Sequence, residues 1–389
     1  MTLSDKLSPR LRTLQQKLDE RFLGKQEIVR LMVVTLVAGE NMLLVGPPGT
    51  GKSALVQLLA KLVEARHFEY LLTRFSEPNE LFGPVDIQAF RKGEYSRRTA
   101  NMLPEAEVVF LDEIGKASSA ILNTLLTVLN ERRLTIGSQR IEVPLVSLFG
   151  ATNEVPNDDT LHALFDRFLL RVYCDNLDSF HFAGLVRAGL ANEAARTARS
   201  DDELKPVLSA KELAELQREF HKLLHFSDDF VATYKGLIFQ IRSEGISVSD
   251  RRVIRLMKLF AASAIVAGRS KPNDSDFDLL RHIWNQPEQR ELIDDFVQPV
   301  LERHYRQHPQ DRPGRTQASL DDLLAELKLI RETLAAGEST SDIQFFAQLK
   351  NLGEIRATLA AMDGDTPRRM LAEVDRMLES VLGSSKLTA

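Results

Sequence analysis

The sequence predicts an α/β fold, in which a five-stranded parallel sheet lies between layers of helices, followed by a helical domain and a separate all-helical C-terminal region. The main observation is that short β-type runs alternate with helical patterns between residues 41 and 173. Such alternation is typical of a parallel sheet. From about residue 178 onward, apolar residues recur at helical spacing, so we expect the sheet to be confined to the first part of the chain.

The expected strands cover residues 42–45, 70–75, 108–111, 145–151 and 168–173. Two stretches interrupt the alternation of strands and helices. Residues 77–105 form an insertion, and residues 133–143, where two β-type runs flank a Gly-Ser-Gln turn, predict a β-hairpin. Within the insertion, Phe82 either grips polypeptide as an exposed loop residue or anchors the segment by packing.

We expect four parts along the chain: an α/β core over residues 1–176, a helical domain over 177–306, a linker over 307–318 and a C-terminal helical module over 319–385. The linker prediction rests on a polar composition with two prolines and a glycine. The C-terminal helices carry apolar stripes that must be buried. They pack either against one another in a three-helix bundle or against a partner.

Two smaller expectations concern the helical domain. One apolar helix face is predicted from residues at helical spacing, namely Val253, Ile254, Met257, Phe260 and Ala261. We expect His304 and His308 to be solvated rather than to bind a metal, because Pro309 follows and no acid accompanies them.

Charge and cysteine content exclude several classes of protein. Among 389 residues, 50 Lys and Arg stand against 55 Asp and Glu, a net charge of −5, so no global basic field attracts nucleic acid or anionic lipid. Cys174 is the single cysteine, which excludes an intrachain disulfide and suits a reducing compartment. The longest apolar-rich stretch, residues 259–268, is half a membrane span. We therefore expect a soluble, cytoplasmic protein with no integral membrane segment.

A glycine-rich loop at residues 46–53 carries the most information. It fits the phosphate-binding pattern G-x-x-x-x-G-K-[ST] and lies between a predicted strand and a predicted helix. Its residues are Gly46-Pro47-Pro48-Gly49-Thr50-Gly51-Lys52-Ser53. The glycines let backbone N–H groups turn toward phosphate oxygens. Lys52 would reach the β- and γ-phosphates of a nucleotide, and the Ser53 hydroxyl would bind Mg²⁺.

Two carboxylates follow the strand predicted at 108–111. Because ligands bind at the carboxyl ends of parallel strands, Asp112 and Glu113 would lie beside the glycine-rich loop. Asp112 can bind Mg²⁺, and Glu113 can polarise the water that attacks the γ-phosphate. The alternative is that these two acids only cap a helix.

Three more polar residues are candidates for the same site. Asn153 follows the strand predicted at 145–151 and either binds the γ-phosphate or the attacking water, or is a turn residue. Arg167 precedes the last strand and could reach the γ-phosphate of a neighbouring subunit; the alternative is a cation at a helix C-terminus. Arg251 opens a helix of the helical domain, from which it could contact the nucleotide and couple hydrolysis to domain movement.

The motifs GPPGTGKS, VVFLDEI, GATNE, LFDRF and SDRR, in this order and at these spacings, resemble those of AAA+ ATPases. The stretches EPNELFGPVDIQAF and KASSAILNTLLTVLNERR closely resemble the MoxR family, and its RavA branch in particular. This resemblance covers about residues 15–285. It implies an αβα core with an insertion at helix 2, a hairpin before sensor 1, and a helical lid.

The resemblance also assigns roles to residues. ATP and Mg²⁺ are the implied ligands, with residues 46–53 as Walker A and the pair Asp112 and Glu113 as Walker B. The implied roles of the remaining candidates are sensor 1 for Asn153, arginine finger for Arg167 and sensor 2 for Arg251. The family contacts adenine at the positions of Phe22, Leu23 and Gly24.

Members of the family form hexamers, act as chaperone-like remodellers or metal-cofactor inserters, and commonly pair with a protein that bears a von Willebrand A domain. We therefore expect a Mg²⁺-dependent ATPase that works as a homohexamer on a protein client. A motor that acts on DNA and a nucleotide-gated scaffold with negligible turnover are the alternatives. The C-terminal region departs from the pattern. Longer RavA chains carry an extra small domain between their C-terminal helices, whereas short turns are expected to join the helices here.

Overall fold

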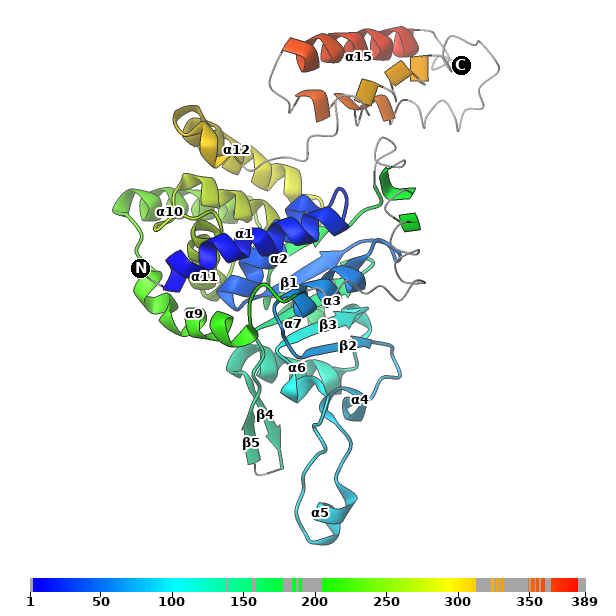
Figure 1. The fold of residues 1–389 in the computed structure, drawn as a ribbon, viewed down its shortest axis with the longest axis vertical. Coiled ribbons are helices and arrows are strands. Elements are labelled where there is room, and N and C mark those ends of the chain that lie inside the picture. The colour runs from blue at the N-terminus through cyan, green and yellow to red at the C-terminus, as the bar shows by residue number, and fades with distance from the viewer. Residues whose placement is uncertain are drawn as a thin grey trace, which may run out of the picture. The chain divides into compact units, whose positions relative to one another are not determined.

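The computed structural model describes residues 3–137, 139–155, 159–177 and 205–312, the short pieces 184–186 and 189–190, and parts of residues 323–383 (Figure 1). The chain divides into two compact units. One contains residues 1–175 and 202–313, and the other contains residues 176–201 and 314–389. Every residue that the sequence nominates for the site belongs to the first unit.

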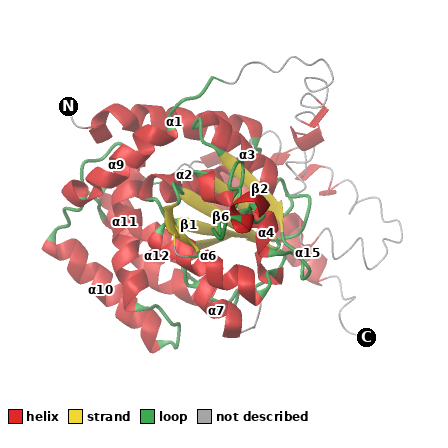
Figure 2. Cartoon of the chain, turned by 90° about the horizontal axis from the view of Figure 1, so that it is seen from below, coloured by secondary structure: helices red, strands yellow, loops and turns green. Residues whose placement is uncertain are grey.

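The first unit is built on a five-stranded parallel sheet with the strand order β2-β3-β6-β1-β7. The strands are β1 (Asn41–Val45), β2 (His67–Leu71), β3 (Val108–Asp112), β6 (Ser147–Thr152) and β7 (Phe168–Tyr173). β1 and β6 are buried along their whole length, as expected of strands covered on both faces. Figure 2 shows helices on both sides of the strands, so the predicted α/β fold is confirmed.

β2 lies closer to the N-terminus than the predicted strand at 70–75. Its pairing with β3 runs from His67↔Val108 to Leu71↔Asp112, and β3 ends at Asp112. Residues 73–75 therefore run past the edge of the sheet, and Phe75 is 91% exposed.

Helices α1 (Leu3–Arg21), α2 (Gln26–Ala38), α3 (Lys52–Leu62), α6 (Ser119–Glu131) and α7 (Asp159–Phe165) belong to the α/β core. α2 is buried along almost its whole length. It packs against α1, against β1 and against α11 (Asp250–Val266) of the helical domain. This environment explains why the helix is almost entirely apolar from Leu31 to Ala38.

The predicted insertion forms an arm. α4 (Pro78–Phe82) lies near its base and α5 (Ile87–Arg91) near its tip, and Figure 1 shows α5 far from the sheet. Phe82 is buried, which favours the packing role, whereas Ile87 and Phe90 are exposed. β4 (Arg133–Ile136) and β5 (Gln139–Glu142) pair as an antiparallel hairpin in the region predicted for one.

The helical domain comprises α9 (Ala210–Leu223), α10 (Asp228–Ser243), α11, the 3₁₀ segment η4 (Asp274–His282) and α12 (Gln289–Gln307). Most of the predicted apolar face of α11 is covered: Phe260 and Ala261 are buried, and Val253 and Met257 are partly buried against the core. The buried surface of the helix is wider than predicted, and one predicted residue lies outside it. Leu256 and Leu259 are buried, and Ile254 is exposed. The reason is that α1, α2 and η4 all pack on α11, so these neighbours rather than one apolar stripe determine which side chains are covered.

Residues 307–312, predicted as part of a linker, are held by the helical domain. α12 runs to Gln307, and Asp311 accepts a hydrogen bond from Asn273 Nδ2 at 2.9 Å. Asp311 also lies 2.8 Å from His304 Nε2, and the His304 ring is buried and stacked on His308. The expectation that His304 is solvated is therefore wrong, because the acid that holds it follows in the supposed linker.

In the second unit, side chains from three stretches pack into one apolar cluster that includes α15 (Asp365–Gly383). Its buried members are Leu323, Leu327, Ile330, Leu352, Ile355, Leu359, Met370 and Val374. Of the predicted stripes, Leu323, Leu327, Met370 and Val374 are thus buried against one another, as in a helical bundle, whereas Leu324 is exposed and Leu320 lies outside the described residues. In the part of the chain that the structure describes, no helix is both long and apolar enough to cross a membrane.

A buried charge cluster ties the helical domain to the start of the sheet. The carboxylate of Glu40, which precedes β1, is 1% exposed and pairs with Arg255 of α11, while Lys258 Nζ lies 3.7 Å away. Arg132, at the end of α6, donates to the Gly39 carbonyl at 2.7 Å. Burial lowers the pKa of Arg132 to about 10, although Glu40 acts in the opposite direction. Removing Glu40 would leave these cations without their buried counter-charge.

Glu40→Gln keeps the size of the side chain but removes its charge. We expect the free energy of unfolding to fall by about 3–5 kcal/mol, the usual loss when a buried pair is broken. Glu142→Gln is the control, because the Arg133–Glu142 pair is exposed (49% and 85%) and an exposed pair contributes roughly 0–1 kcal/mol. Denaturant titration measures both, and equal losses would contradict the role of Glu40.

Candidate functional site

The glycine-rich loop turns sharply between β1 and α3. Gly46, Gly49 and Gly51 have φ angles of 149°, 83° and 84°, which favour glycine. Gly46 also passes close to the residue that follows β7: a Cβ atom there would lie 2.5 Å from the carbonyl oxygen of Cys174. The loop conformation therefore requires glycine at Gly46 for steric reasons as well.

Lys52, the first residue of α3, folds back over the loop. Its Nζ donates to the carbonyl oxygens of Gly46 and Pro47, both at 2.7 Å, and Thr50 Oγ1 donates to the Pro47 carbonyl at 3.1 Å. Ser53 follows in the first turn of α3. The loop thus brings an ammonium, a hydroxyl and a helix N-terminus together, a combination suited to phosphate.

The two predicted acids and Asn153 meet beside this loop. β1, β3 and β6 end next to one another, and Gly46 N–H donates to the Thr152 carbonyl at 3.0 Å. Asn153 Nδ2 donates to Glu113 Oε1 at 2.6 Å. Glu113 adopts a left-handed conformation with φ of 53°, in which its N–H donates to Asp112 Oδ1 at 2.9 Å. This geometry brings the carboxylates and the amide together as the order of strand ends predicts.

Lys116 is a residue of this cluster that the sequence reasoning missed. Its Nζ lies 3.4 Å from Glu113 Oε2, so Glu113 has an amide at one oxygen and a cation at the other. The spacing of three residues in the turn after β3 is the signal that could have found it. Lys116 can help to keep the Glu113 carboxylate in place.

The segment expected to contact adenine also lies at the loop. The Phe22 ring is 3.7 Å from the position of a Cβ on Gly51. Gly24 has a φ of 67°, and the next residue, Lys25, donates from Nζ to the Asp175 carbonyl. These contacts place Phe22 against the loop, with Leu23 and Gly24 in the turn that follows.

Arg167 and Arg251 lie on the opposite side of the sheet from the glycine-rich loop, near the amino-terminal ends of β1 and β7. Arg167 immediately precedes Phe168, which is in register with Asn41 at the start of β1, and Asn41 Nδ2 donates to the Arg167 carbonyl at 3.4 Å. Arg251 donates to the side chain of Asn130, which also accepts from Arg167. The structure therefore does not bring Arg251 to the glycine-rich loop of its own chain, as a contact with its own nucleotide would require.

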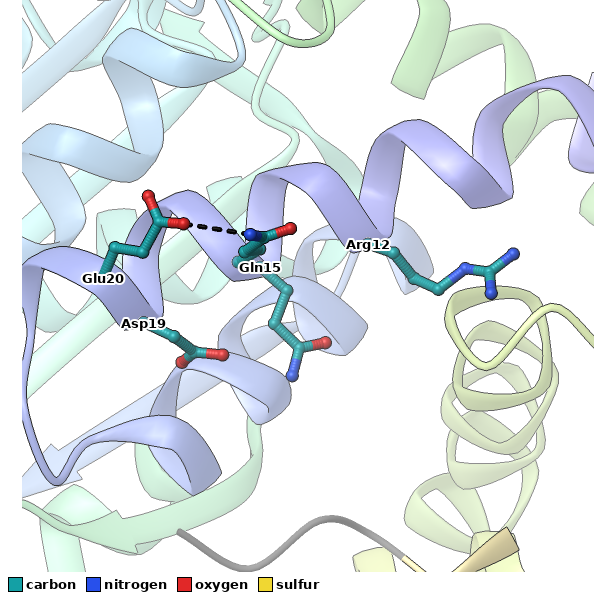
Figure 3. A pocket seen from close by; sticks show the side chains of 5 residues that line it. Arg12, Gln15, Asp19 and Glu20 are labelled. Carbon is teal, nitrogen blue, oxygen red and sulfur yellow. Dashed lines mark hydrogen bonds between the residues drawn. The ribbon is translucent and has the colours of Figure 1, made fainter. Parts of the chain in front are cut away.

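A pocket on α1 is separate from these residues (Figure 3). Its lining residues are Arg12, Gln15, Gln16, Asp19 and Glu20. Burial raises the pKa of Asp19 to about 6, although a hydrogen bond with Gln15 opposes the shift. Gln16 donates from Nε2 to Glu20 Oε1 at 3.0 Å. None of the predicted site residues lines this pocket.

Comparison with known families identifies the chain. A sequence profile of the MoxR domain in MoxR-vWA-beta-propeller ternary systems matches residues 9–218, and a profile of the AAA lid domain matches residues 230–297. The chain belongs to the MoxR family of AAA+ ATPases. Residues 230–297 of the helical domain thus form an AAA lid, and the loop, the acids and Asn153 all fall within the MoxR match.

Individual relatives agree with this assignment. The MoxR-family chain is 34% identical over 285 residues to an uncharacterized protein of Methanocaldococcus jannaschii, covering 72% of each. It is 27% identical over 153 residues to a Mycobacterium tuberculosis protein named Chaperone MoxR1, covering 38% of this chain and 40% of that one. The solved structure of a candidate ATPase from Cytophaga hutchinsonii shares the fold, with a TM-score of 0.61, 18% identity and coverage of 77% and 96%.

Gly46→Ala tests the steric requirement at the loop. Gly49→Ala is the matched control, because Gly49 also has a positive φ but nothing lies within 4 Å of a Cβ there. We expect Gly49→Ala to cost about 1–2 kcal/mol from backbone strain alone, and Gly46→Ala to cost more because the Cys174 carbonyl must move. Thermal unfolding measures the difference, and equal shifts for the two variants would contradict it.

Proposed function

We propose that this MoxR-family protein is a Mg²⁺-dependent ATPase of the RavA branch that works as a homohexameric ring and remodels a protein client. The observation that carries the proposal is the convergence of the glycine-rich loop, the acid pair and Asn153 at one edge of the sheet, with Asn153 bonded to Glu113. The resemblance of the insertion and of α6 to RavA sequences supports the branch.

The donors at this edge fit Mg²⁺. The Ser53 hydroxyl and the Asp112 carboxylate are hard oxygen ligands, and one or two protein ligands suffice because Mg²⁺ keeps several waters and takes its other ligands from phosphate. A bound Mg²⁺ would neutralise charge on the β- and γ-phosphates. Lys52 would exchange the loop carbonyls for phosphate oxygens, and Phe22 would offer an aromatic face to the base.

Glu113 is the proposed general base. One carboxylate oxygen accepts from Asn153 and the other faces Lys116, so the group is oriented from two sides. A carboxylate held in this way can orient a water and accept its proton during attack on the γ-phosphate. Asn153 is placed to orient the same water or to donate to the γ-phosphate.

The position of Arg167 supports a ring. Because it lies at the amino ends of the strands, it can stabilise transition-state charge only on a nucleotide held by a neighbouring copy. A closed ring supplies such a neighbour to every subunit. Hexamers are the assembly that the family resemblance implies.

Partners and location are inferred from the comparisons. The matching profile was described for systems that combine MoxR with a vWA component, and one relative is named a chaperone. We therefore propose a von Willebrand A-domain partner and a protein client. The net charge of −5 and the single cysteine suit the cytoplasm.

Glu113→Gln is expected to bind ATP and to hydrolyse it at least about 100-fold more slowly, since general-base catalysis typically contributes 10²–10⁴-fold. Nucleotide affinity should persist because Lys52, Ser53 and Asp112 are unchanged. Glu154→Gln, an exposed acid beside Asn153, is the control and should keep normal turnover. Steady-state phosphate release and a nucleotide-binding titration measure the two effects; normal turnover by Glu113→Gln would rule out its role as base.

Arg167→Ala is expected to lose on the order of 10³-fold in turnover, in line with other arginine fingers. Lys52→Ala should also be inactive, because it lacks the phosphate-binding ammonium. When the two variants are mixed, some interfaces contain an intact loop and an intact Arg167, so activity should partly return. No recovery in rings shown to contain both variants would indicate that Arg167 acts within its own chain.

A further inference from the structure

The side chain of Asn130 joins two arginines that are far apart in the sequence. Its Oδ1 accepts from Arg167 Nε at 2.9 Å and from Arg251 Nη2 at 2.5 Å. Asn130 lies near the end of α6, and the next turn of chain is fixed to the sheet by the bond from Arg132 to the Gly39 carbonyl. The amide oxygen is therefore held on a rigid element, while the arginines come from the core and from the lid.

Holding two guanidinium groups on one oxygen opposes their mutual repulsion. Arg167 donates to the Ala163 carbonyl at 2.9 Å and lies 3.3 Å from Asp166. Burial and the charge of Arg251 together lower the pKa of Arg167. Asp166 pairs with Arg167, and the neutral amide of Asn130 fixes both cations without adding a second negative charge. A carboxylate at position 130 would pair with both arginines and compete with an incoming phosphate.

The location of Arg167 and Arg251 indicates which phosphate they can contact. Arg167 is at the start of β7, beside the start of β1, and the glycine-rich loop follows the end of β1. A strand of five residues separates these edges by roughly 16 Å at the usual rise per residue. A phosphate in contact with this pair is therefore one bound by another copy of the chain.

We propose that Asn130 is a positioning residue, which holds Arg167 and Arg251 as one cationic pair directed at the nucleotide of the neighbouring subunit. The proposal rests on the proposed function, because it needs hydrolysis across a subunit interface. Asn130 itself touches neither nucleotide nor water. Its effect on turnover passes entirely through the two arginines.

The first test is steady-state turnover of Asn130→Ala. We expect a loss on the order of 100-fold, as for other small misplacements of catalytic groups, with unchanged ATP affinity. Adding Asn130→Ala to Arg167→Ala should cause little further loss, because both act through one group. Asn123→Ala, an exposed residue two turns earlier on α6, is the control and should keep normal turnover. Asn130→Asp keeps the size of the side chain but adds a charge that pairs with both arginines, so we expect it to lose turnover as well, and it serves as the second variant should Asn130→Ala fail to fold.

The second test is subunit mixing, which a purely structural role would not satisfy. Asn130→Ala should regain activity when mixed with Lys52→Ala, which supplies an intact arginine edge, but not when mixed with Arg167→Ala, which has the same defective edge. Recovery with Arg167→Ala, or normal turnover by both Asn130 variants while Arg167→Ala is inactive, overturns the role of Asn130. Normal turnover by Arg167→Ala instead overturns the proposed function on which it rests.

Discussion

The parallel pairing of β1 with β6 on one side and with β7 on the other is the constraint on which the rest of the molecule depends. In a parallel sheet, the residues that follow the strands lie together at the carboxyl ends, and the residues that precede the strands lie together at the amino ends. The glycine-rich loop, Glu113 and Asn153 gather at the carboxyl ends. Arg167 and Glu40 gather at the amino ends. One chain therefore presents the glycine-rich loop and Arg167 at opposite ends of the strands, and in the proposed ring a neighbouring copy would bring the two together.

Buried arginines attach the lid to the sheet, near the point where α11 begins after its cap, Ser249. Arg171 of β7 and Arg252 of α11 both donate to Asn285 Oδ1, at 2.7 and 2.8 Å. Burial, followed by the charge of Arg252, lowers the pKa of Arg171 to about 9. Buried ionic groups contribute little net stability once desolvation is counted, but they strongly disfavour arrangements that leave them unpaired. The contacts of Arg171 and Arg252 hold the start of α11 against β7, and so fix the position of Arg251.

Much of the fold and of the nucleotide edge could be predicted from the sequence, because local patterns determine them. A buried strand followed by a glycine-rich loop and a helix identifies β1 and α3, and polar residues after β3 and β6 must share an edge with that loop. The position of β2 could not be predicted in the same way. Its limits depend on where β3 ends, at Asp112. Residues 73–75, which end in Phe75, are part of the predicted strand but lie beyond the last residue of β3.

The place of Arg251 depends on long-range packing that no local pattern reports. The angle at which a helix crosses the sheet decides where its first residues lie. They can lie near the glycine-rich loop of the same chain or near the amino ends of the strands. Here the crossing is set by the burial of Glu40 against Arg255 and by the contacts of Arg252. Because Arg251 and Arg252 are adjacent on α11, the buried arginine fixes the exposed one. Asn130 has no local signal either, since its partners lie 37 and 121 residues away in the sequence. Two arginines thus share one amide oxygen at both places: at Asn285 the arginines are buried and join the lid to the sheet, whereas Asn130 is exposed, so that its two arginines are the pair proposed to meet another subunit.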